Sequence, residues 1–361
     1  MPATTHAEFN ANTEASEVAK AFAAGIRGKT IMVTGVNRGG IGFSTAQAFA
    51  SQNPACLIVT GRSPAKIQGS IGALRAEFPT VEYRGLQVDL SLQKSVRDAA
   101  DEVLSWTDIS SIDIVVNSAG VWGVDERTLT QDGIEMHLAT NHLGHWLLTC
   151  LIMPKLITAA GNNPPGTTRI VNVTSASPQF SGMRWSDMNF VKKNKDLPAA
   201  EQPNYEWFKM FGYTGVENLC HVSLDGYSRS KVANVLFGIA ANKRLLSRYG
   251  ILTVAVHPGI IETELGRNFE PDALAAVQES KQRGLFSTKT LGAGASTSLV
   301  AALDPLLAQG VGESKHDSEN WGSYLDDCQI SGMAHPLAVS SEEAEKLWDV
   351  SEKLAGQAFS W

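Results

Sequence analysis

A tyrosine and a lysine four positions apart, Tyr227 and Lys231, are the pair best suited to proton chemistry in this chain. At that spacing the two side chains stand on one face of a helix. A phenol normally titrates near pH ~10, which makes it a poor acid–base group at neutral pH. An ammonium group one helical turn away favours the phenolate and lowers that pKa. The pattern is also common on solvated helix faces, so its meaning depends on what the rest of the chain places beside it.

A second group for such chemistry is the hydroxyl of Ser175, which directly follows the apolar run Arg169–Thr174. A run of this kind is typical of a parallel strand that is covered on both faces. In doubly wound sheets, ligands bind at the carboxyl ends of such strands. We therefore expect Ser175 to meet Tyr227 across a ligand cleft.

A glycine-rich segment, Thr34–Gly42, joins the first apolar run of the chain to an amphipathic stretch. Glycines let the backbone turn sharply and approach a pyrophosphate at the start of a helix. By itself the loop is also compatible with a turn that binds no ligand. In this context it predicts a dinucleotide site.

Two arginines indicate which dinucleotide is bound. Arg62 follows the second apolar run, and no Asp or Glu occurs from Ala55 to Ala76. An acidic residue there would bind the ribose hydroxyls of NAD, whereas an arginine accommodates the 2′-phosphate of NADP. Arg62 and Arg38 of the glycine-rich segment predict a clamp on that phosphate, unless both point into solvent. The predicted cofactor is NADP(H).

Apolar runs alternate with longer amphipathic stretches after residue 28, which predicts a parallel, doubly wound sheet. The expected strands are Thr30–Thr34, Cys56–Thr60, Val81–Asp89, Ile112–Asn117, Arg169–Thr174 and Leu252–His257. The expected helices are Ile41–Ser51, Ala65–Glu77, Leu92–Trp106, Gly133–Ile157 and Leu224–Tyr249. With a late strand within residues 322–327, the prediction is a Rossmann-type α/β fold whose mainly parallel, seven-stranded sheet has helices on both faces.

A single domain, residues 29–361, is expected after an N-terminal arm of residues 1–28. Residues 178–222 are rich in aromatic side chains and too long for an ordinary connection. We expect an insertion that forms either a substrate-lining lid or a small separate core or subunit contact. Residues 258–286 are expected to form a substrate loop, and residues 337–361 to carry a C-terminal helix.

Composition excludes several classes of protein. The 37 acidic and 30 basic residues are scattered, so no nucleic-acid surface is expected. Four well-separated cysteines predict neither disulfides nor a metal site and suit a reducing compartment. No run of about 18 apolar residues and no secretory signal is found, so we expect no membrane span and a cytoplasmic location.

Several motifs in order make the chain resemble the short-chain dehydrogenase/reductase family. They are Thr34–Gly42, Val88-Asp89-Leu90, Asn117–Gly120, Asn141, Ser175, Tyr227 with Lys231, and His257–Thr263. Within the family, Asn141–Trp146, Asp187–Phe190 and Glu342–Trp348 look like the retinol-dehydrogenase-like branch. Ser175 and Tyr227 are 52 positions apart, more than the family usually has, so the insertion falls inside the active-site region.

The resemblance implies a catalytic tetrad of Asn141, Ser175, Tyr227 and Lys231. In it Tyr227 exchanges a proton with the substrate oxygen, Lys231 binds the nicotinamide ribose and lowers the pKa of Tyr227, and Ser175 holds the substrate oxygen. Asn141 fixes a water that relays protons through Lys231. The implied cofactor-binding residues are Gly35, Asn37, Arg38, Gly40, Ile41, Gly42, Arg62, Asp89, Leu90, Asn117, Ala119, Gly120, Tyr227, Lys231, Pro258, Gly259, Ile261 and Thr263. His142 and His145 are expected to be packing or hydrogen-bonded residues, not ligands.

The predicted function is an NADP(H)-dependent carbonyl reductase that interconverts a bulky lipophilic ketone or aldehyde and its alcohol, in secondary metabolism. An apolar, aromatic-walled pocket fits such a substrate. One alternative is an NADP-binding regulatory or scaffold protein without turnover. Another is a dehydratase or cyclase that acts on a natural-product intermediate. The expected partners are the substrate and a second copy of the chain in a homodimer.

Overall fold

The computed structural model describes residues 4–263, 265, 275, 278–279, 281–284, 287–309, 311–315 and 318–361. One eight-stranded sheet runs through the molecule in the order β3-β2-β1-β4-β5-β6-β7-β8. Its strands are β1 Thr30–Val33, β2 Cys56–Gly61, β3 Glu82–Gln87, β4 Ile114–Asn117, β5 Thr168–Val173, β6 Ile251–His257, β7 Tyr324–Asp326 and β8 Gln329–Ile330. All neighbours pair in parallel except β7 and β8. The predicted doubly wound, mainly parallel sheet is confirmed.

The predicted number of seven strands is wrong, because β8 was not expected. It has two residues and pairs antiparallel with β7. The turn between them places Asp327 and Cys328 at φ 48° and 67°. Two consecutive residues at positive φ make the tight turn of a two-residue hairpin, which usually carries Asn or Gly. Neither the turn residues nor so short a strand produces a recognisable sequence pattern.

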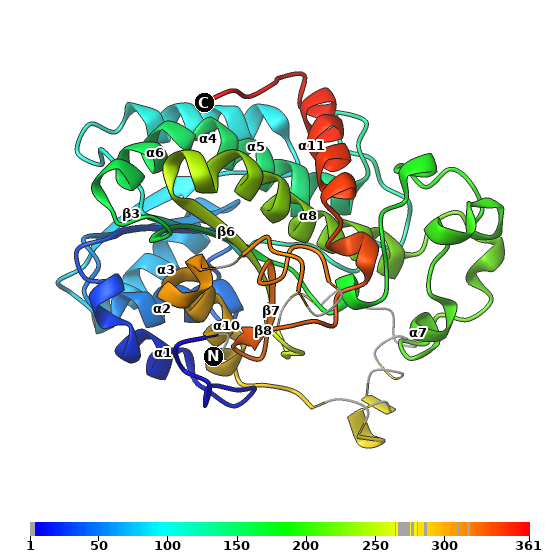
Figure 1. Ribbon diagram of the computed structural model, residues 1–361, viewed down its shortest axis with the longest axis horizontal. Helices are drawn as coiled ribbons and strands as arrows, with labels where there is room; N and C mark the ends of the chain where they lie inside the picture. The colour runs from blue at the N-terminus through cyan, green and yellow to red at the C-terminus, as the bar shows by residue number, and fades with distance from the viewer. Residues whose placement is uncertain are drawn as a thin grey trace.

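Helices cover both faces of the sheet (Figure 1). They are α1 Ala15–Ala21, α2 Ile41–Ala50, α3 Pro64–Glu77, α4 Gln93–Ser105, α5 Gly144–Leu151, α6 Met153–Asn162, α7 Tyr205–Lys209, α8 Ser223–Tyr249, α10 Leu291–Leu303 and α11 Ser341–Ala355. One core lies between the sheet and α4, α5, α6, α8 and α11. The other lies between the sheet and α1, α2, α3 and α10. The apolar strands are buried by both cores, as their near-continuous hydrophobicity requires.

The helix expected over Gly133–Ile157 is divided in the structure. It begins with a π-helical segment, Leu138–Leu143, and continues as α5. Pro154, which has no backbone N–H to donate, lies in the first turn of α6, where the chain restarts after Ile152. No single described helix is long and apolar enough to cross a membrane. The bent pair Leu138–Leu151 and Met153–Asn162, with 59° between its halves, meets that test by length and composition only.

The two ends of the chain pack onto the fold. In α1, Val18 and Ala19 are fully buried in the core beside α10 and α2. The C-terminal helix α11 packs on α8; Ser340 caps its start by accepting the Glu343 N–H, and Gly356, at φ 63°, caps its end. Trp348 of α11 contacts Trp146 of α5 edge to face, at 5.4 Å between ring centroids.

Candidate active site

The turn after β1 forms a close-packed cradle. Gly35 has φ 71°, and a Cβ there would lie 2.7 Å from the Ala119 Cα. A Cβ on Gly42 would lie 2.6 Å from the Gly35 carbonyl oxygen. Helix α2 begins after Gly40, whose lack of a side chain leaves the first N–H groups without a side-chain cap. Such free N–H groups at a helix start are suited to bind a phosphate.

The cradle opens into a cleft of about 400 Å³ at the carboxyl end of the sheet. Of the predicted cofactor residues, the cleft is lined by Gly35, Asn37, Arg38, Gly40, Ile41, Gly42, Arg62, Leu90, Ala119, Gly120 and Thr263. Val88 and Ser118, which belong to two of the sequence motifs, also line it. The lining residues that the sequence analysis did not single out for the site are Thr60, Gly61, Val121, Trp122, Val124, Met136, Thr140 and Leu265.

The other predicted cofactor residues mostly position the chain around this cleft. The Asp89 carboxylate accepts hydrogen bonds from Ser91, and the buried Asn117 amide donates to Asn172 of β5. Ile261 packs against Gly294 of α10. Gly259, which follows Pro258, has φ 90° and lies against the Lys289 side chain. The expected substrate loop, residues 258–286, lies mostly outside the described residues.

Arg38 and Arg62 both line the cleft and are exposed. Among the described residues, neither guanidinium forms an ion pair with a carboxylate. Arg62 follows β2, where its backbone carbonyl accepts a hydrogen bond from Gln87 of the strand alongside. Two arginines held at the rim of a cleft, with no carboxylate between them, favour an anionic ligand.

The four predicted catalytic residues come together next to the cleft, beside Gly120 and Trp122 of its lining. Asn141 and Lys231 both border Gly120. A Cβ atom added to this glycine would lie 3.4 Å from Asn141 Oδ1 and 3.5 Å from Lys231 Nζ. Lys231 donates to the Val173 carbonyl at 3.0 Å. The Ser175 hydroxyl donates to Ser177 Oγ at 2.9 Å and also lies within hydrogen-bond reach of the Tyr227 phenol. Sheet and helix α8 thus bring the residues at positions 141, 175, 227 and 231 into one site.

Burial controls the titration of this group. It raises the pKa of the Tyr227 phenol far above its usual value, and the hydrogen bond from Ser175 only partly opposes this. The sequence predicted that Lys231 lowers the pKa of Tyr227, but burial has the larger effect and the pKa is raised. The Lys231 ammonium lies 5.6 Å from the centre of the phenol ring, and its own pKa is lowered by burial to about 8.

Asn141 is held on both sides. Its side chain accepts from the Val121 N–H at 2.7 Å and donates to the Val121 carbonyl and to Ser230. It sits in the π-helical segment, a backbone irregularity that is frequent at functional sites.

His145 links Asn141 to the end of β1. The Thr34 hydroxyl accepts the N–H groups of Ser118 and Ala119, so its one hydrogen is free to bond His145 Nε2 at 2.8 Å. The His145 Nδ1–H then donates to the Asn141 carbonyl at 3.1 Å. Burial lowers the pKa of His145 to about 4, which keeps the ring neutral. His145 is a hydrogen-bonded residue of the core, as expected.

An aromatic wall stands over the site. The Trp122 indole stacks on the Tyr227 ring at 4.7 Å between centroids, and Phe211 of the insertion contacts Trp122 edge to face. Trp207 and Phe208 of α7 form a small core with Val216, Val222 and Leu224, and this core packs against Trp122. The insertion therefore has a core of its own and also reaches Trp122, which stacks on Tyr227. The aromatic composition of residues 178–222 predicted the insertion from the sequence. Trp122 lies outside that segment, so the sequence did not predict its part in the wall.

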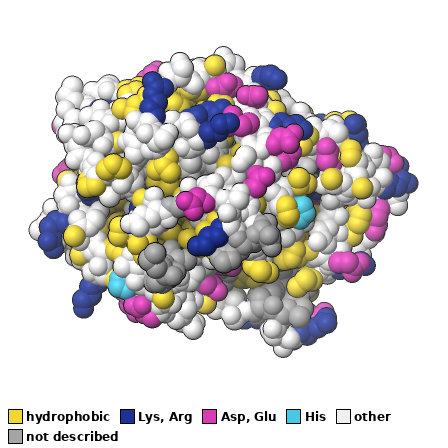
Figure 2. Space-filling model, in the orientation of Figure 1, with side chains coloured by type: hydrophobic (Ala, Val, Ile, Leu, Met, Phe, Trp, Pro, Cys, Tyr) yellow, Lys and Arg dark blue, Asp and Glu magenta, His cyan; other side chains and the backbone are white. Residues whose placement is uncertain are grey.

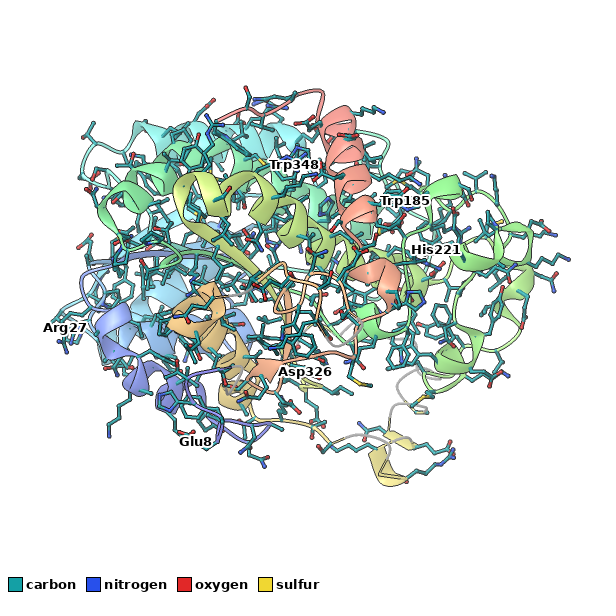
Figure 3. All side chains as sticks on the ribbon, in the orientation of Figure 1. Glu8, Arg27, Trp185, His221, Asp326 and Trp348 are labelled. Carbon is teal, nitrogen blue, oxygen red and sulfur yellow. The ribbon has the colours of Figure 1, made fainter. Side chains whose placement is uncertain are left out.

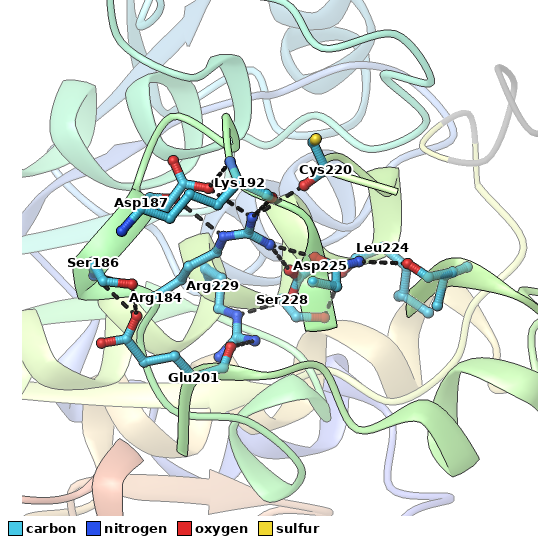
Figure 4. Close-up of polar contacts among 12 residues, drawn as sticks. Arg184, Ser186, Asp187, Lys192, Glu201, Cys220, Leu224, Asp225, Ser228 and Arg229 are labelled. Carbon is cyan, nitrogen blue, oxygen red and sulfur yellow. Dashed lines mark hydrogen bonds and ion pairs between the residues drawn. The ribbon is translucent and has the colours of Figure 1, made fainter. Parts of the chain in front are cut away.

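Buried charges fix the base of this insertion to α8 (Figure 4). Arg184 donates to Asp187 at 2.7 Å and to Asp225, of the first turn of α8, at 3.0 Å. Arg229 donates to the other oxygen of Asp225 at 2.8 Å. All these side chains are nearly or fully buried. The network connects the insertion to the helix turn that carries Tyr227.

Comparison with known proteins agrees with this geometry. Residues 29–187 match the family model for short chain dehydrogenases. The chain is 38% identical over 251 residues to an oxidoreductase, fscI, of Fusarium equiseti, covering 70% of this chain and 94% of that protein. It is 32% identical over 351 residues to human retinol dehydrogenase 12, covering 95% and 93% of the two chains. An NADPH-bound carbonyl reductase from chicken fatty liver shares the fold, with a TM-score of 0.54 and 18% identity over 84% of this chain and 99% of that one.

Proposed function

This chain belongs to the short-chain dehydrogenase/reductase family, in its retinol-dehydrogenase-like branch, and from that premise we propose an NADP(H)-dependent carbonyl reductase. Its substrate is a bulky lipophilic ketone or aldehyde, which it reduces to the alcohol with Tyr227 as the acid. The observation that carries the proposal is the meeting of Asn141, Ser175, Tyr227 and Lys231 beside Gly120 and Trp122, two residues that line the cleft.

The cleft fits a nicotinamide dinucleotide phosphate. Gly35 and Gly42 let the turn after β1 pack so closely that any Cβ would collide with Ala119 or with the Gly35 carbonyl, and the start of α2 presents N–H groups that a pyrophosphate would accept. Arg38 and Arg62 lie at the rim, where they would hold the 2′-phosphate. Gly120 borders Lys231, which would bind the nicotinamide ribose.

When bound, the cofactor supplies the hydride, and the protein orients the substrate and moves the proton. Ser175 holds the carbonyl oxygen next to the Tyr227 phenol. Because burial raises the pKa of that phenol, it carries its proton before reaction and has it ready to donate to the developing alkoxide. Lys231, with a pKa lowered to about 8, exchanges protons with solvent near neutral pH and replaces the one that Tyr227 gives up.

The aromatic wall supports a lipophilic substrate. Trp122, Met136 and Thr140 extend the cleft beyond the cofactor cradle, and Phe211 of the insertion packs on Trp122. Retinol dehydrogenases among the relatives are named for a lipophilic alcohol. We infer that residues 178–222 both fold around their own core and form the substrate wall.

Location and assembly complete the proposal. All four cysteines are free, which supports a reducing compartment such as the cytoplasm. Lys, Arg, Asp and Glu intermingle on the face seen in Figure 2, which offers no basic stripe for nucleic acid. A homodimer would use a surface other than the side of α8 that α11 covers.

The decisive experiment follows NADPH absorbance against a panel of lipophilic ketones and aldehydes, with product analysis. Tyr227→Phe should lose turnover by about a thousandfold or more. Its NADPH affinity should change by no more than a few-fold, because the phenol is not needed to hold the phosphates. Tyr249→Phe, at the other end of α8, is the matched control and should keep full activity.

Other results would identify the alternatives. NADPH that binds and is never oxidised would favour a regulatory or scaffold protein. Product formed without cofactor oxidation would favour a dehydratase or cyclase. Turnover that survives Tyr227→Phe would contradict the assignment of the acid.

A further inference from the structure

Glu135, His137 and His221 form a cluster beside the first turn of α8, which we call the Glu–His–His cluster. Each offers one metal-ligand atom, and these three atoms lie within 4.8 Å of one another. Glu135 and His137 are fully buried, and His221 is half-buried. His221 lies where the insertion returns to the body of the molecule, two residues before α8 (Figure 3). The cluster thus joins two segments that are distant in sequence.

Hydrogen bonding within the cluster is incomplete. His137 Nδ1 pairs with Glu135 Oε1 at 2.7 Å, and Glu135 Oε2 accepts the Leu138 N–H at 2.8 Å. His137 Nε2 is buried and has no hydrogen-bond partner among the described residues. Both ring nitrogens of His221 are likewise shielded and form no bond of normal geometry, although the Asp125 backbone lies close by. Buried polar atoms of this kind are uncommon unless a ligand, ion or water satisfies them.

The surroundings hold the cluster in place. A Cβ on Gly226 would lie 2.7 Å from His137 Nδ1 and 3.1 Å from Glu135 Oε1, so a larger residue there would displace the pair. The His137 and His221 rings face each other at 6.4 Å, with 19° between their planes. Phe190 packs edge to face on His221 at 5.5 Å.

We propose that the Glu–His–His cluster binds a divalent transition-metal ion such as Zn²⁺. Imidazole nitrogens and a carboxylate are ligands that such ions take, at about 2.0–2.2 Å for Zn²⁺. The ion would tie the end of the insertion to the segment before the π-helix. The sequence predicted no metal site because no Cys or His spacing marked one.

Metal binding is tested on the full chain after treatment with a chelator. Co²⁺ should bind one ion per chain and give visible absorption bands, and Zn²⁺ should displace it and raise the melting temperature. His221→Ala should weaken Zn²⁺ binding by about tenfold or more, as should His137→Gln. His6→Ala is the control, because His6 pairs with Glu8 on the surface, and its variant should bind like the wild type.

Two results would overturn the proposal. One is the absence of saturable Co²⁺ or Zn²⁺ binding by the folded wild type. The other is unchanged binding in His221→Ala, whose half-buried position makes it the variant that should fold even if His137→Gln does not. The readout is metal occupancy, so it stands or falls separately from the reductase activity.

Discussion

The Trp122 indole lies flat on the Tyr227 phenol, with ring centroids 4.7 Å apart and ring planes 15° apart. Trp122 comes from the loop after β4, and Tyr227 from the first turns of α8. The stack covers one face of the Tyr227 ring and also receives the edge of Phe211 from the insertion. Through this contact the insertion reaches the tyrosine that we propose as the acid.

Removing this stack should impair catalysis more than folding. Trp122→Ala frees the phenol to move and admits water to it, and we expect kcat/KM to fall by about tenfold to a hundredfold. Trp122→Phe keeps an aromatic face on Tyr227 and should stay within a few-fold of wild type. Steady-state kinetics with a bulky and a small ketone would test this. Equal loss in both variants would show that the indole acts in some other way than by stacking.

Arg62 should select between the two nicotinamide cofactors. Arg62→Ala removes a charge-assisted bond to the 2′-phosphate, worth about 1.5–3 kcal/mol, so NADPH binding should weaken by about tenfold to a hundredfold. NADH, which lacks that phosphate, should bind as before. Fluorescence titration with both cofactors measures the difference, with Arg27→Ala, an exposed arginine before β1, as the control. The assignment fails if both cofactors lose the same affinity.

The carboxyl of Asp326, at the end of β7, should make stability depend on pH. Burial, reinforced by the neighbouring Asp327, raises its pKa to about 6 from the ordinary value of 3.8. The folded state therefore favours the protonated acid, so its contribution is present below pH ~4 and is lost as the pH rises through ~6. Discounting for partial exposure, we expect a loss of about 1–2 kcal/mol from pH 4 to pH 7.

Asp326→Asn should remove this loss and be more stable than the wild type at pH 7. Urea unfolding at pH 4.5, 6 and 7.5 provides the measurement, with the exposed Asp101→Asn of α4 as the control. Parallel pH profiles for wild type and Asp326→Asn would contradict the prediction.

The buried charges at the base of the insertion should be costly to break. Arg184→Met leaves Asp187 and part of Asp225 without their cation, and we expect a loss of about 3–5 kcal/mol in the free energy of unfolding. The exposed pair Lys209–Glu206 has the same signs, and Lys209→Met should cost less than about 1 kcal/mol. Limited proteolysis should cut Arg184→Met between residues 184 and 220 before the rest of the chain. Resistance equal to wild type would show that the apolar core of the insertion holds it without the charges.

The sequence by itself determined the parallel sheet and the residues of the candidate site. Parallel strands that are buried on both faces are nearly continuous apolar runs, so their positions can be predicted directly from the sequence. Their carboxyl ends share one edge of the sheet, so Ser175 and the glycine-rich segment had to lie together. The helical spacing of Tyr227 and Lys231 then placed both on the side of α8 that faces this edge.

Tertiary structure alone decided the Glu–His–His cluster, the aromatic stack and the pKa of Tyr227. These features depend on contacts between segments that are far apart in the sequence and that no local sequence pattern connects. Glu135 and His221 are 86 positions apart, and only the packing of the insertion on α8 brings them together. The stack of Trp122 on Tyr227 arises in the same way. The pKa of Tyr227 shows the difference most clearly. Sequence spacing indicated a neighbouring cation that lowers it, whereas the depth of burial, which no local pattern encodes, raises it.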